Sequence, residues 1–269
     1  MLSIYAPIEN QNSKCWSVFE GIQKTWPEST QIVNNTKNLV KSPAMFWGLV
    51  NLNSDIIHQL EQNKQDYYFT DTPYFGRFDN QNLKKDNHYW RFSKNNIHAK
   101  LINGCPADRF EKFNVKFEDN TTSRSHILIC PSSAGIHRYL DHNTWLDDTI
   151  NEIKKYTDRP IKVRIKPRGR GTSGPSEAKV PLSEDLKNAF CCVTSCSISA
   201  VESLMMRVPV FCHKKSFAAE ISNTDLSQIE NPVYQDPTEL LRGLCYQQFT
   251  PEEYENGKAV SILKDFKIL

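Results

Sequence analysis

Small hydroxyl side chains are concentrated in the segment TSCSISAVESLMMRVPVFC, residues 194–212, where a helix is predicted to begin. Ser195, Ser197 and Ser199 follow the apolar run AFCCVT, which predicts a buried strand. The first N–H groups of a helix have no partner within the helix and carry partial positive charge, so they attract phosphate groups. A helix cap needs one serine, and the presence of three favours a phosphate site over capping alone.

A second turn of the same kind follows an earlier predicted strand. In CPSSAG, residues 130–135, Ser132 and Ser133 supply hydroxyl groups, and Gly135 allows a ligand to approach the backbone closely. Ligands of open α/β sheets bind at the carboxyl ends of the strands, which is where both turns are expected. Many turns from a strand into a helix have this composition, so the second turn alone is weak evidence.

Basic side chains accumulate in KKYTDRPIKVRIKPRGR, residues 154–170, which contains eight Lys or Arg residues and one acid. Arg164 and Lys166 alternate along KVRIKP, so they are predicted on one side of a strand, near the end that Pro167 marks. Arg168 follows directly. An anionic ligand is one explanation of this charge, and a solvated basic surface is the other.

Asp71 is predicted at the end of an aromatic strand in YYFTDTPYFGR. A carboxylate in this place suits a general base at the edge of a binding site. Aspartate before Pro73 also suits a turn, and both interpretations stay open. Among the histidines, His137 is placed to face a ligand because it follows the 130–135 turn.

The overall composition is that of an ordinary globular protein. Of 269 residues, 39% are hydrophobic and 24% are charged, and the net charge of +2 does not by itself indicate nucleic-acid binding. No apolar run approaches the roughly 18–20 residues that span a bilayer, and no signal-peptide pattern opens the chain, so we expect a cytoplasmic protein without membrane insertion. The eight cysteines lack CxxC spacing and are expected to be thiols in apolar segments rather than zinc ligands.

Strands and helices alternate along most of the chain, which predicts an α/β fold with parallel, helix-covered sheets. The polar segment 106–123 separates two halves. We expect a Rossmann-like domain over residues 1–120, a second one over 121–235, and two helices over 236–269 that are placed to cross back to the first domain. A short helix with Ser183 as its N-cap is expected in PLSEDLKNA.

Three glycines, Gly169, Gly171 and Gly174, formally spell the GxGxxG pattern of dinucleotide-binding folds. The segment PSEAKVP follows them, and no helix can begin there as that fingerprint requires. We therefore exclude a dinucleotide site. The GxxxxGK[ST] pattern of P-loop nucleotidases does not occur in the sequence either.

The region 124–215 resembles the nucleotide-sugar-binding half of GT-B glycosyltransferases, and it is most similar to capsule-polysaccharide-type transferases. The resemblance rests on short motifs: the basic element ending in Lys166-Pro167, SEDL, the serine turn, ESL and Pro209-Val210. Two departures stand out. Arg207-Val208 replace the usual glycine before the late Pro-Val, and Lys166 replaces the usual histidine of the basic motif.

This resemblance implies two Rossmann-like domains facing a cleft and a nucleotide-sugar donor, with UDP-sugars as the expected class. The donor diphosphate would lie on the serine turn, with the basic strand neutralising it and Glu202 bonding to ribose or sugar hydroxyls. The residues assigned to the donor in this way are Ser132, Ser133, Gly135, Arg164, Lys166, Arg168, Ser195, Ser197, Ser199 and Glu202. The resemblance implies no metal and no cofactor, and it favours Asp71 as the catalytic base.

The acceptor is predicted from the first half of the chain. Its aromatic and basic segments resemble small transferase-like proteins of tailed phages, some of which glycosylate hydroxymethylated pyrimidines in DNA. Tyr74, Arg77 and Arg91 would then hold DNA, in the cytoplasm of a phage host. A saccharide acceptor, hydrolysis of an activated sugar, and a nucleotide- or phosphate-binding module without turnover remain as alternatives. The oligomeric state is not predicted.

Overall fold

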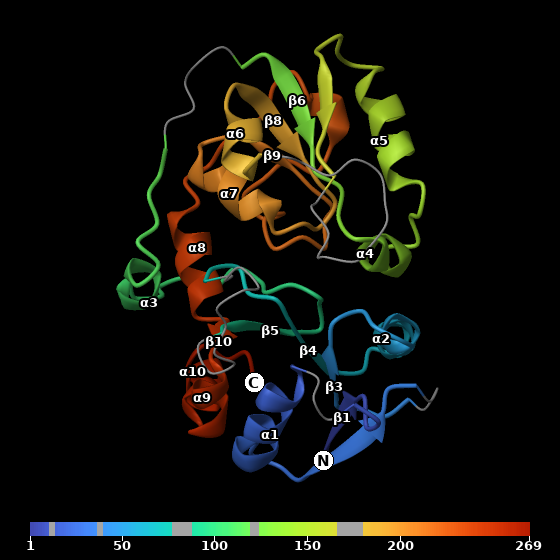
Figure 1. Cartoon of the computed structure of the whole chain (residues 1–269), viewed down its shortest axis with the longest axis vertical. Coiled ribbons are helices and arrows are strands. Elements are labelled where there is room, and N and C mark those ends of the chain that lie inside the picture. Colours follow the sequence, from blue (N-terminus) through green and yellow to red (C-terminus); the bar gives the residue numbers. More distant parts are fainter. Residues whose placement is uncertain (11–13, 37–39, 77–87, 119–123, 166–179) are drawn as a thin grey trace. The chain divides into compact units, whose positions relative to one another are not determined.

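A computed structural model describes residues 1–10, 14–36, 40–76, 88–118, 124–165 and 180–269. Three residues expected in a site, Arg77, Lys166 and Arg168, lie outside the described residues. The chain divides into two compact units (Figure 1). Unit 1 combines residues 1–113 with 239–269, and unit 2 comprises residues 114–238. The sequence placed its boundaries after residues 120 and 235.

Unit 1 is built on a six-stranded sheet in which four neighbouring strands run parallel and the two strands at one edge join by antiparallel pairing. In spatial order, the strands are β10 (Gln248–Phe249), β5 (Trp90–Lys94), β4 (Tyr67–Asp71), β3 (Ala44–Trp47), β1 (Leu2–Ala6) and β2 (Thr30–Asn34). Nearly every residue of β1, β3 and β4 is buried, as expected for parallel strands covered on both faces.

The helices of unit 1 cover this sheet. They are α1 (Trp16–Thr25), α2 (Asn53–Gln62), α3 (Asp108–Glu111), α8 (Thr238–Cys245), which begins at the unit boundary, α9 (Pro251–Glu255) and α10 (Lys258–Asp265). One core joins Ile4 of β1, Phe19 of α1, Tyr254 of α9 and Leu263 of α10. One face of the sheet is therefore covered by helices from both ends of the chain.

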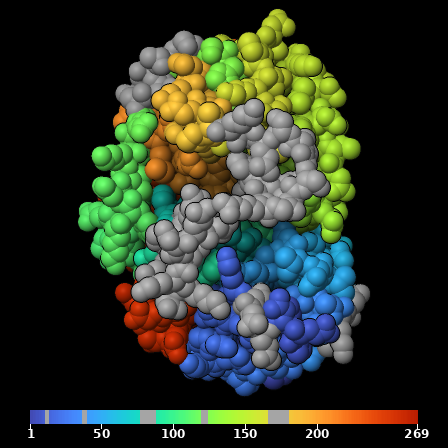
Figure 2. Space-filling view, in the orientation of Figure 1, coloured from blue at the N-terminus to red at the C-terminus, as the bar shows by residue number. Residues whose placement is uncertain are grey.

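The C-terminal segment belongs to unit 1. Strand β10 pairs antiparallel with β5, and α9 packs against α1. The segment is drawn in red beside the blue N-terminal residues (Figure 2). From residue 238 onward the structure has three helices and a strand, where two helices were expected. The strand forms because Gln248 and Phe249 are extended and pair with β5 at the edge of the sheet.

Unit 2 contains a four-stranded parallel sheet with its helices on both faces (Figure 1). In spatial order, the strands are β7 (Ile161–Val163), β6 (His126–Ile129), β8 (Ala189–Val193) and β9 (Val210–Phe211). The helices and the short 3-10 turn are α4 (Ala134–Tyr139), α5 (Trp145–Ile153), α6 (Leu182–Leu186), α7 (Ser199–Met205) and η2 (Leu226–Gln228). The expected α/β fold class with parallel sheets is confirmed in both units.

Two connections of unit 2 leave the sheet in opposite directions. From β6 the chain passes through α5 to β7 on one side, and from β8 it passes through α7 to β9 on the other. The α5 side buries Ile127, Val193 and Phe211, whereas Leu186 and Val208 lie in a second core on the opposite face. The carboxyl ends of β6 and β8 therefore form a topological switch point, the usual position of ligands in open α/β sheets.

Two local predictions differ from the structure. The expected N-cap Ser183 lies inside α6, whose N-cap is Pro181, because the extended backbone at Pro181 places the helix start two residues earlier. Strand β7 ends at Val163, so Arg164 follows the strand instead of alternating along it. Its N–H still donates to Ile129 O of β6 (2.8 Å).

Candidate functional site

The two serine turns meet at the switch point of unit 2. Ser132, after β6, and Ser195, after β8, are 63 residues apart in sequence, and Ser195 Oγ donates to Ser132 Oγ (2.6 Å). The N–H of Cys196 donates to the same Ser132 oxygen (3.0 Å). Ser195 is fully buried, whereas Ser132 is half-buried. The structure thus joins the two turns that the sequence singled out separately.

Other hydroxyl groups of the second turn bind its own backbone. Ser197 N donates to Thr194 Oγ1 (3.3 Å), and Ser199 N donates to Ser197 Oγ (3.2 Å). Ser199 lies at the first position of α7, and its buried hydroxyl adjoins the Cys130 thiol. The pKa of Cys130 is raised, chiefly by the hydrogen bond with Cys192 and by burial, and Ser199 reduces this rise. Capping therefore accounts for Thr194 and Ser197, but it does not account for the link between the turns.

His137 of α4 extends this cluster. Its Nε2 lies 3.2 Å from Ser195 Oγ, and its ring stacks on Trp145 of α5, with ring centroids 5.2 Å apart. Burial, with a smaller contribution from His142, lowers the pKa of His137, so the imidazole is neutral at neutral pH. A neutral ring with its proton on Nε2 donates to Ser195, whose own proton then goes to Ser132. The sequence indicated His137 only by its place after the first turn.

Ser133, Gly135 and Glu202 frame the two turns. Ser133 is exposed and caps α4, because its Oγ accepts from Ile136 N (3.4 Å). Gly135 lies in the first turn of α4. Glu202 lies in the first turn of α7 with an exposed side chain.

Arg164 is held in a buried ion pair. Its Nη1 contacts Asp185 Oδ2, and Lys162 Nζ lies 2.6 Å from the other oxygen of the same carboxylate. Burial would raise the pKa of Asp185, but hydrogen bonds from Lys162 and Arg164 lower it overall. Arg164 also lowers the pKa of Cys130, which places its charge near the start of the first serine turn. Two cations share one carboxylate, so the group carries a net positive charge.

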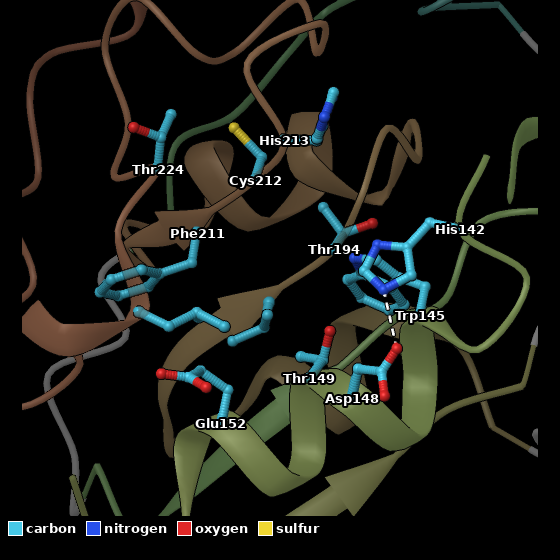
Figure 3. A pocket seen from close by; sticks show the side chains of 12 residues that line it. His142, Trp145, Asp148, Thr149, Glu152, Thr194, Phe211, Cys212, His213 and Thr224 are labelled. Carbon is cyan, nitrogen blue, oxygen red and sulfur yellow. Dashed lines mark hydrogen bonds and ion pairs between the residues drawn. The ribbon is translucent and has the colours of Figure 1, made fainter. Parts of the chain in front are cut away.

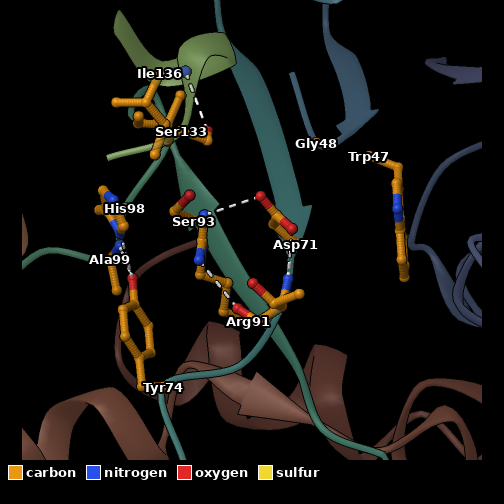
Figure 4. Close-up of polar contacts among 12 residues, drawn as sticks. Trp47, Gly48, Asp71, Tyr74, Arg91, Ser93, His98, Ala99, Ser133 and Ile136 are labelled. Carbon is orange, nitrogen blue, oxygen red and sulfur yellow. Dashed lines mark hydrogen bonds and ion pairs between the residues drawn. The ribbon is translucent and has the colours of Figure 1, made fainter. Parts of the chain in front are cut away.

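Asp71, Tyr74 and Arg91, three of the residues expected on the acceptor side, lie in unit 1, around the end of β4 and on the neighbouring β5 (Figure 4). Asp71 is paired with Arg91 of β5, whose Nη2 lies 3.2 Å from Asp71 Oδ2. Thr72 N donates to Asp71 Oδ1 (2.6 Å), as expected of a turn residue. The side chain of Asp71 is nevertheless 31% exposed, while that of Arg91 is 3% exposed.

Tyr74 and Arg91 are buried and engaged within unit 1. Tyr74 Oη accepts from Ala99 N (2.8 Å) and lies 3.2 Å from His98 Nδ1 (Figure 4). Arg91 donates to Thr72 O (3.0 Å), and its guanidinium lies over the rings of Phe69 and Tyr74. These two side chains position Asp71 and the loop after β4.

A pocket of about 300 Å³ opens in unit 2 beside the serine turns (Figure 3). Its walls come from α5, from the ends of β8 and β9, and from the loop before η2. Aromatic walls are provided by Trp145 and Phe211, and Thr194, directly before Ser195, also lines it. The sequence did not indicate this pocket, because its walls come from segments far apart in the chain.

Three further findings concern the described part of the chain. No group of three or more His, Cys, Asp or Glu side chains there is arranged to hold a metal ion. Among its helices, none has the length and apolar character needed to cross a bilayer. All eight cysteines are buried and free.

Comparisons with known proteins give a distant structural likeness. No family model matches the sequence, and no curated protein matches it. KpsC, beta Kdo 2,4 transferase, of Thermosulfurimonas dismutans is 9% identical, with 97% of each chain covered and a TM-score of 0.46. KpsC, beta Kdo 2,7 transferase, of the same organism is 13% identical, with 99% of each chain covered and a TM-score of 0.45. Similarity at this level carries no argument about function.

Proposed function

We propose that this protein is a glycosyltransferase that uses a nucleotide-sugar and binds the donor phosphates between the two serine turns of unit 2. The observation that carries the proposal is the contact of Ser132 with Ser195 and with the N–H of Cys196, at the ends of two strands whose connections diverge. Phosphate groups are the anions that hydroxyl and N–H donors at such a crevice bind.

The hydrogen bonds at Ser132 support a donor role for its hydroxyl. A hydroxyl oxygen has two lone pairs and one proton. Ser132 Oγ accepts from Ser195 and from Cys196, so both lone pairs are occupied and its own proton is left to donate. Because Ser132 is half-buried, a phosphate oxygen is the partner that we propose for this proton.

Positive charge near the first turn supports the same assignment. Arg164 and Lys162 share Asp185 and keep one net positive charge beside Cys130. Fixed positive charge stabilises the negative charge that develops on a leaving phosphate. We propose that Arg164 acts in this way while Asp185 holds it in place. Lys166 and Arg168 lie outside the described residues.

Asp71 is the proposed base. In transfer, a hydroxyl oxygen of the acceptor bonds to the anomeric carbon of the donor sugar, the bond from that carbon to the phosphate oxygen breaks, and Asp71 takes the hydroxyl proton. Arg91 and Thr72 hold the carboxylate in one orientation, and its side chain remains partly exposed. The nucleotide leaves with the electron pair of the broken bond.

We propose a saccharide acceptor. The DNA acceptor expected from the sequence receives no support, because Tyr74 and Arg91 are buried and Arg77 lies outside the described residues. A saccharide acceptor is one of the alternatives that the sequence leaves open.

A mass-spectrometric transfer assay tests the proposal. The full chain is incubated with UDP-, GDP- and CMP-sugars and with saccharide acceptors, or with DNA that contains hydroxymethylcytosine. Sugar mass on a saccharide supports the proposal, and sugar mass on DNA would replace its acceptor. Asp71→Asn should bind nucleotide normally and lose transfer, whereas equal loss of both in this variant would contradict its role as base.

The binding step has its own test. Ser132→Ala should weaken pyrophosphate binding, measured by calorimetry, by about tenfold, the effect of losing roughly one hydrogen bond to a charged group. Ser227→Ala, at an exposed serine of η2, is the matched control and should change nothing. Nucleotide binding without any transfer would favour the alternative of a binding module without turnover.

A further inference from the structure

A row of three side chains leads from helix α4 to the proposed phosphate site. His137 Nε2 lies 3.2 Å from Ser195 Oγ, which lies 2.6 Å from Ser132 Oγ. The three residues come from α4, from the turn after β8 and from the turn after β6. His137 and Ser195 are buried, whereas Ser132 is half-buried. Ser132 is therefore the member of the row that can contact a bound phosphate.

The two hydroxyl groups of this row can direct their protons in either of two ways. A hydroxyl group has one proton to donate and two lone pairs that accept. If Ser195 donates to Ser132, the Ser132 proton is left for a ligand. If Ser132 donates to Ser195, its proton is used inside the protein, and a phosphate meets only lone pairs, which repel it. The affinity for an anion therefore depends on what fixes the direction.

The imidazole of His137 is placed to fix it. Burial lowers the pKa of His137, so the ring is neutral and carries one N–H. Among the described residues, none forms a hydrogen bond with its Nδ1, whereas Ser195 lies within reach of its Nε2. A proton on Nε2 is thus the one that finds a partner there. Its donation occupies the Ser195 oxygen and leaves the Ser195 proton for Ser132.

Packing by itself does not account for the choice of histidine. The ring stacks on Trp145 of α5, with centroids 5.2 Å apart and an angle of 25° between the planes. Phenylalanine or tyrosine would also stack there, because stacking requires no ring nitrogen. The contact with Ser195, in contrast, requires one. Substitutions can therefore separate the two roles of this side chain.

We propose that His137 is a positioning residue for the phosphate site, whose Nε2–H holds Ser195 as a donor to Ser132 and so directs the Ser132 proton to the bound phosphate. The inference rests on the proposed function and deepens it, because it assigns an effect on phosphate affinity to a side chain that does not touch the ligand. A donor that is already oriented strengthens binding, since the ligand need not reorganise it. Successive hydrogen bonds in such a row also polarise one another.

Calorimetry with inorganic pyrophosphate and the full chain tests the role of the nitrogen. His137→Phe keeps a ring against Trp145 and removes the N–H, so it should weaken binding about three- to fivefold, the effect of roughly one uncharged hydrogen bond. His137→Gln, whose amide supplies an N–H close to the position of Nε2, should bind within about twofold of the wild type. His58→Phe, on α2 of unit 1, is the matched control and should leave the affinity unchanged.

Two further measurements test the route through Ser195. In a Ser195→Ala background, His137→Phe should change the affinity less than about twofold, because the residue that passes on its effect is absent. An effect of the same size in both backgrounds would overturn the inference. Nitrogen NMR of the chain labelled at histidine should show a proton on Nε2 of His137 and none on Nδ1. The opposite tautomer would overturn the inference even if a variant fails to fold.

The outcomes also separate this inference from the proposed function. Binding that Ser132→Ala weakens and His137→Phe leaves unchanged overturns the role of His137 and still supports the phosphate site. A folded His137→Gln protein that binds as weakly as His137→Phe overturns that role too. If the wild-type chain does not bind pyrophosphate, the phosphate site fails and the inference fails with it.

Discussion

Asp185 shows how one buried side chain sets the charge beside the serine turns. Its carboxylate is 6% exposed and contacts both Lys162 and Arg164. The sequence motif predicted Arg164 as a cation for a ligand, and the structure adds the carboxylate that orients it. A buried cation keeps its charge when a carboxylate compensates it, so Asp185 is as important to the site as the arginine.

Loss of this carboxylate should lower stability in a pH-dependent way. The pKa of Asp185 is lowered in the folded protein, so its stabilising contribution is present above the unfolded pKa, about 3.9, and is lost as pH falls through the lower folded value. Asp185→Asn should lower the free energy of unfolding by about 2–3 kcal/mol at pH 7.

Urea unfolding at pH 7, 4 and 3 measures this effect. The difference between Asp185→Asn and wild type should shrink toward pH 3, while Asp158→Asn, at an exposed carboxylate of the same unit, should stay close to wild type at pH 7. A difference that does not change with pH would show that the ion pairs of Asp185 contribute nothing.

Helix α1 illustrates how a single small residue sets the distance between elements. A Cβ atom added at Gly21 would lie 2.8 Å from Glu255 N and 2.9 Å from Tyr254 C of α9. Glycine in a helix interior costs about 1 kcal/mol relative to alanine, so its presence here is explained by packing rather than by helix propensity. The close approach of α1 and α9 attaches the C-terminal segment to the sheet of unit 1.

Gly21→Ala should therefore destabilise unit 1. Overpacking against backbone atoms should outweigh the gain in helix propensity and lower the free energy of unfolding by about 1–2 kcal/mol. Thermal unfolding followed by circular dichroism measures the change. Gln23→Ala, at an exposed position of the same helix, should be neutral or slightly stabilising. A Gly21→Ala protein as stable as the Gln23→Ala protein would show that α9 can move away at no cost.

On the scale of the whole molecule, unit 1 is completed by the end of the chain. Arg109 of α3 donates to Gln248 O of β10 (2.7 Å) and to Cys245 O at the end of α8 (2.9 Å). It also forms a buried ion pair with Glu253 of α9 (2.6 Å). One guanidinium therefore contacts three elements of the returning segment.

Arg109→Met should destabilise unit 1 by about 3 kcal/mol, because Glu253 remains buried without this partner. Hydrogen exchange should show faster exchange in β3, β4 and β5 and unchanged exchange in β6 and β8 of unit 2. Lys24→Met removes an exposed ion pair with Glu255 and should leave the stability close to that of the wild type. Equal acceleration in both units would contradict the assignment of residues 239–269 to unit 1.

The sequence by itself determined the α/β class, the two serine turns and the order of strands and helices apart from the C-terminal segment, where β10 was not expected. These features depend on local patterns: apolar runs for buried strands, helical spacing, and small polar residues where a strand ends. Their boundaries were less certain where cap chemistry decides, as at Ser183, which lies inside α6.

The tertiary structure decided which of these residues meet. The contact of Ser132 with Ser195, the partners of Arg164 and Asp71, the pocket beside Trp145 and the return of β10 to β5 all join residues distant in sequence. A local pattern carries no information on such pairs, because strand order and the faces chosen by the helices bring them together.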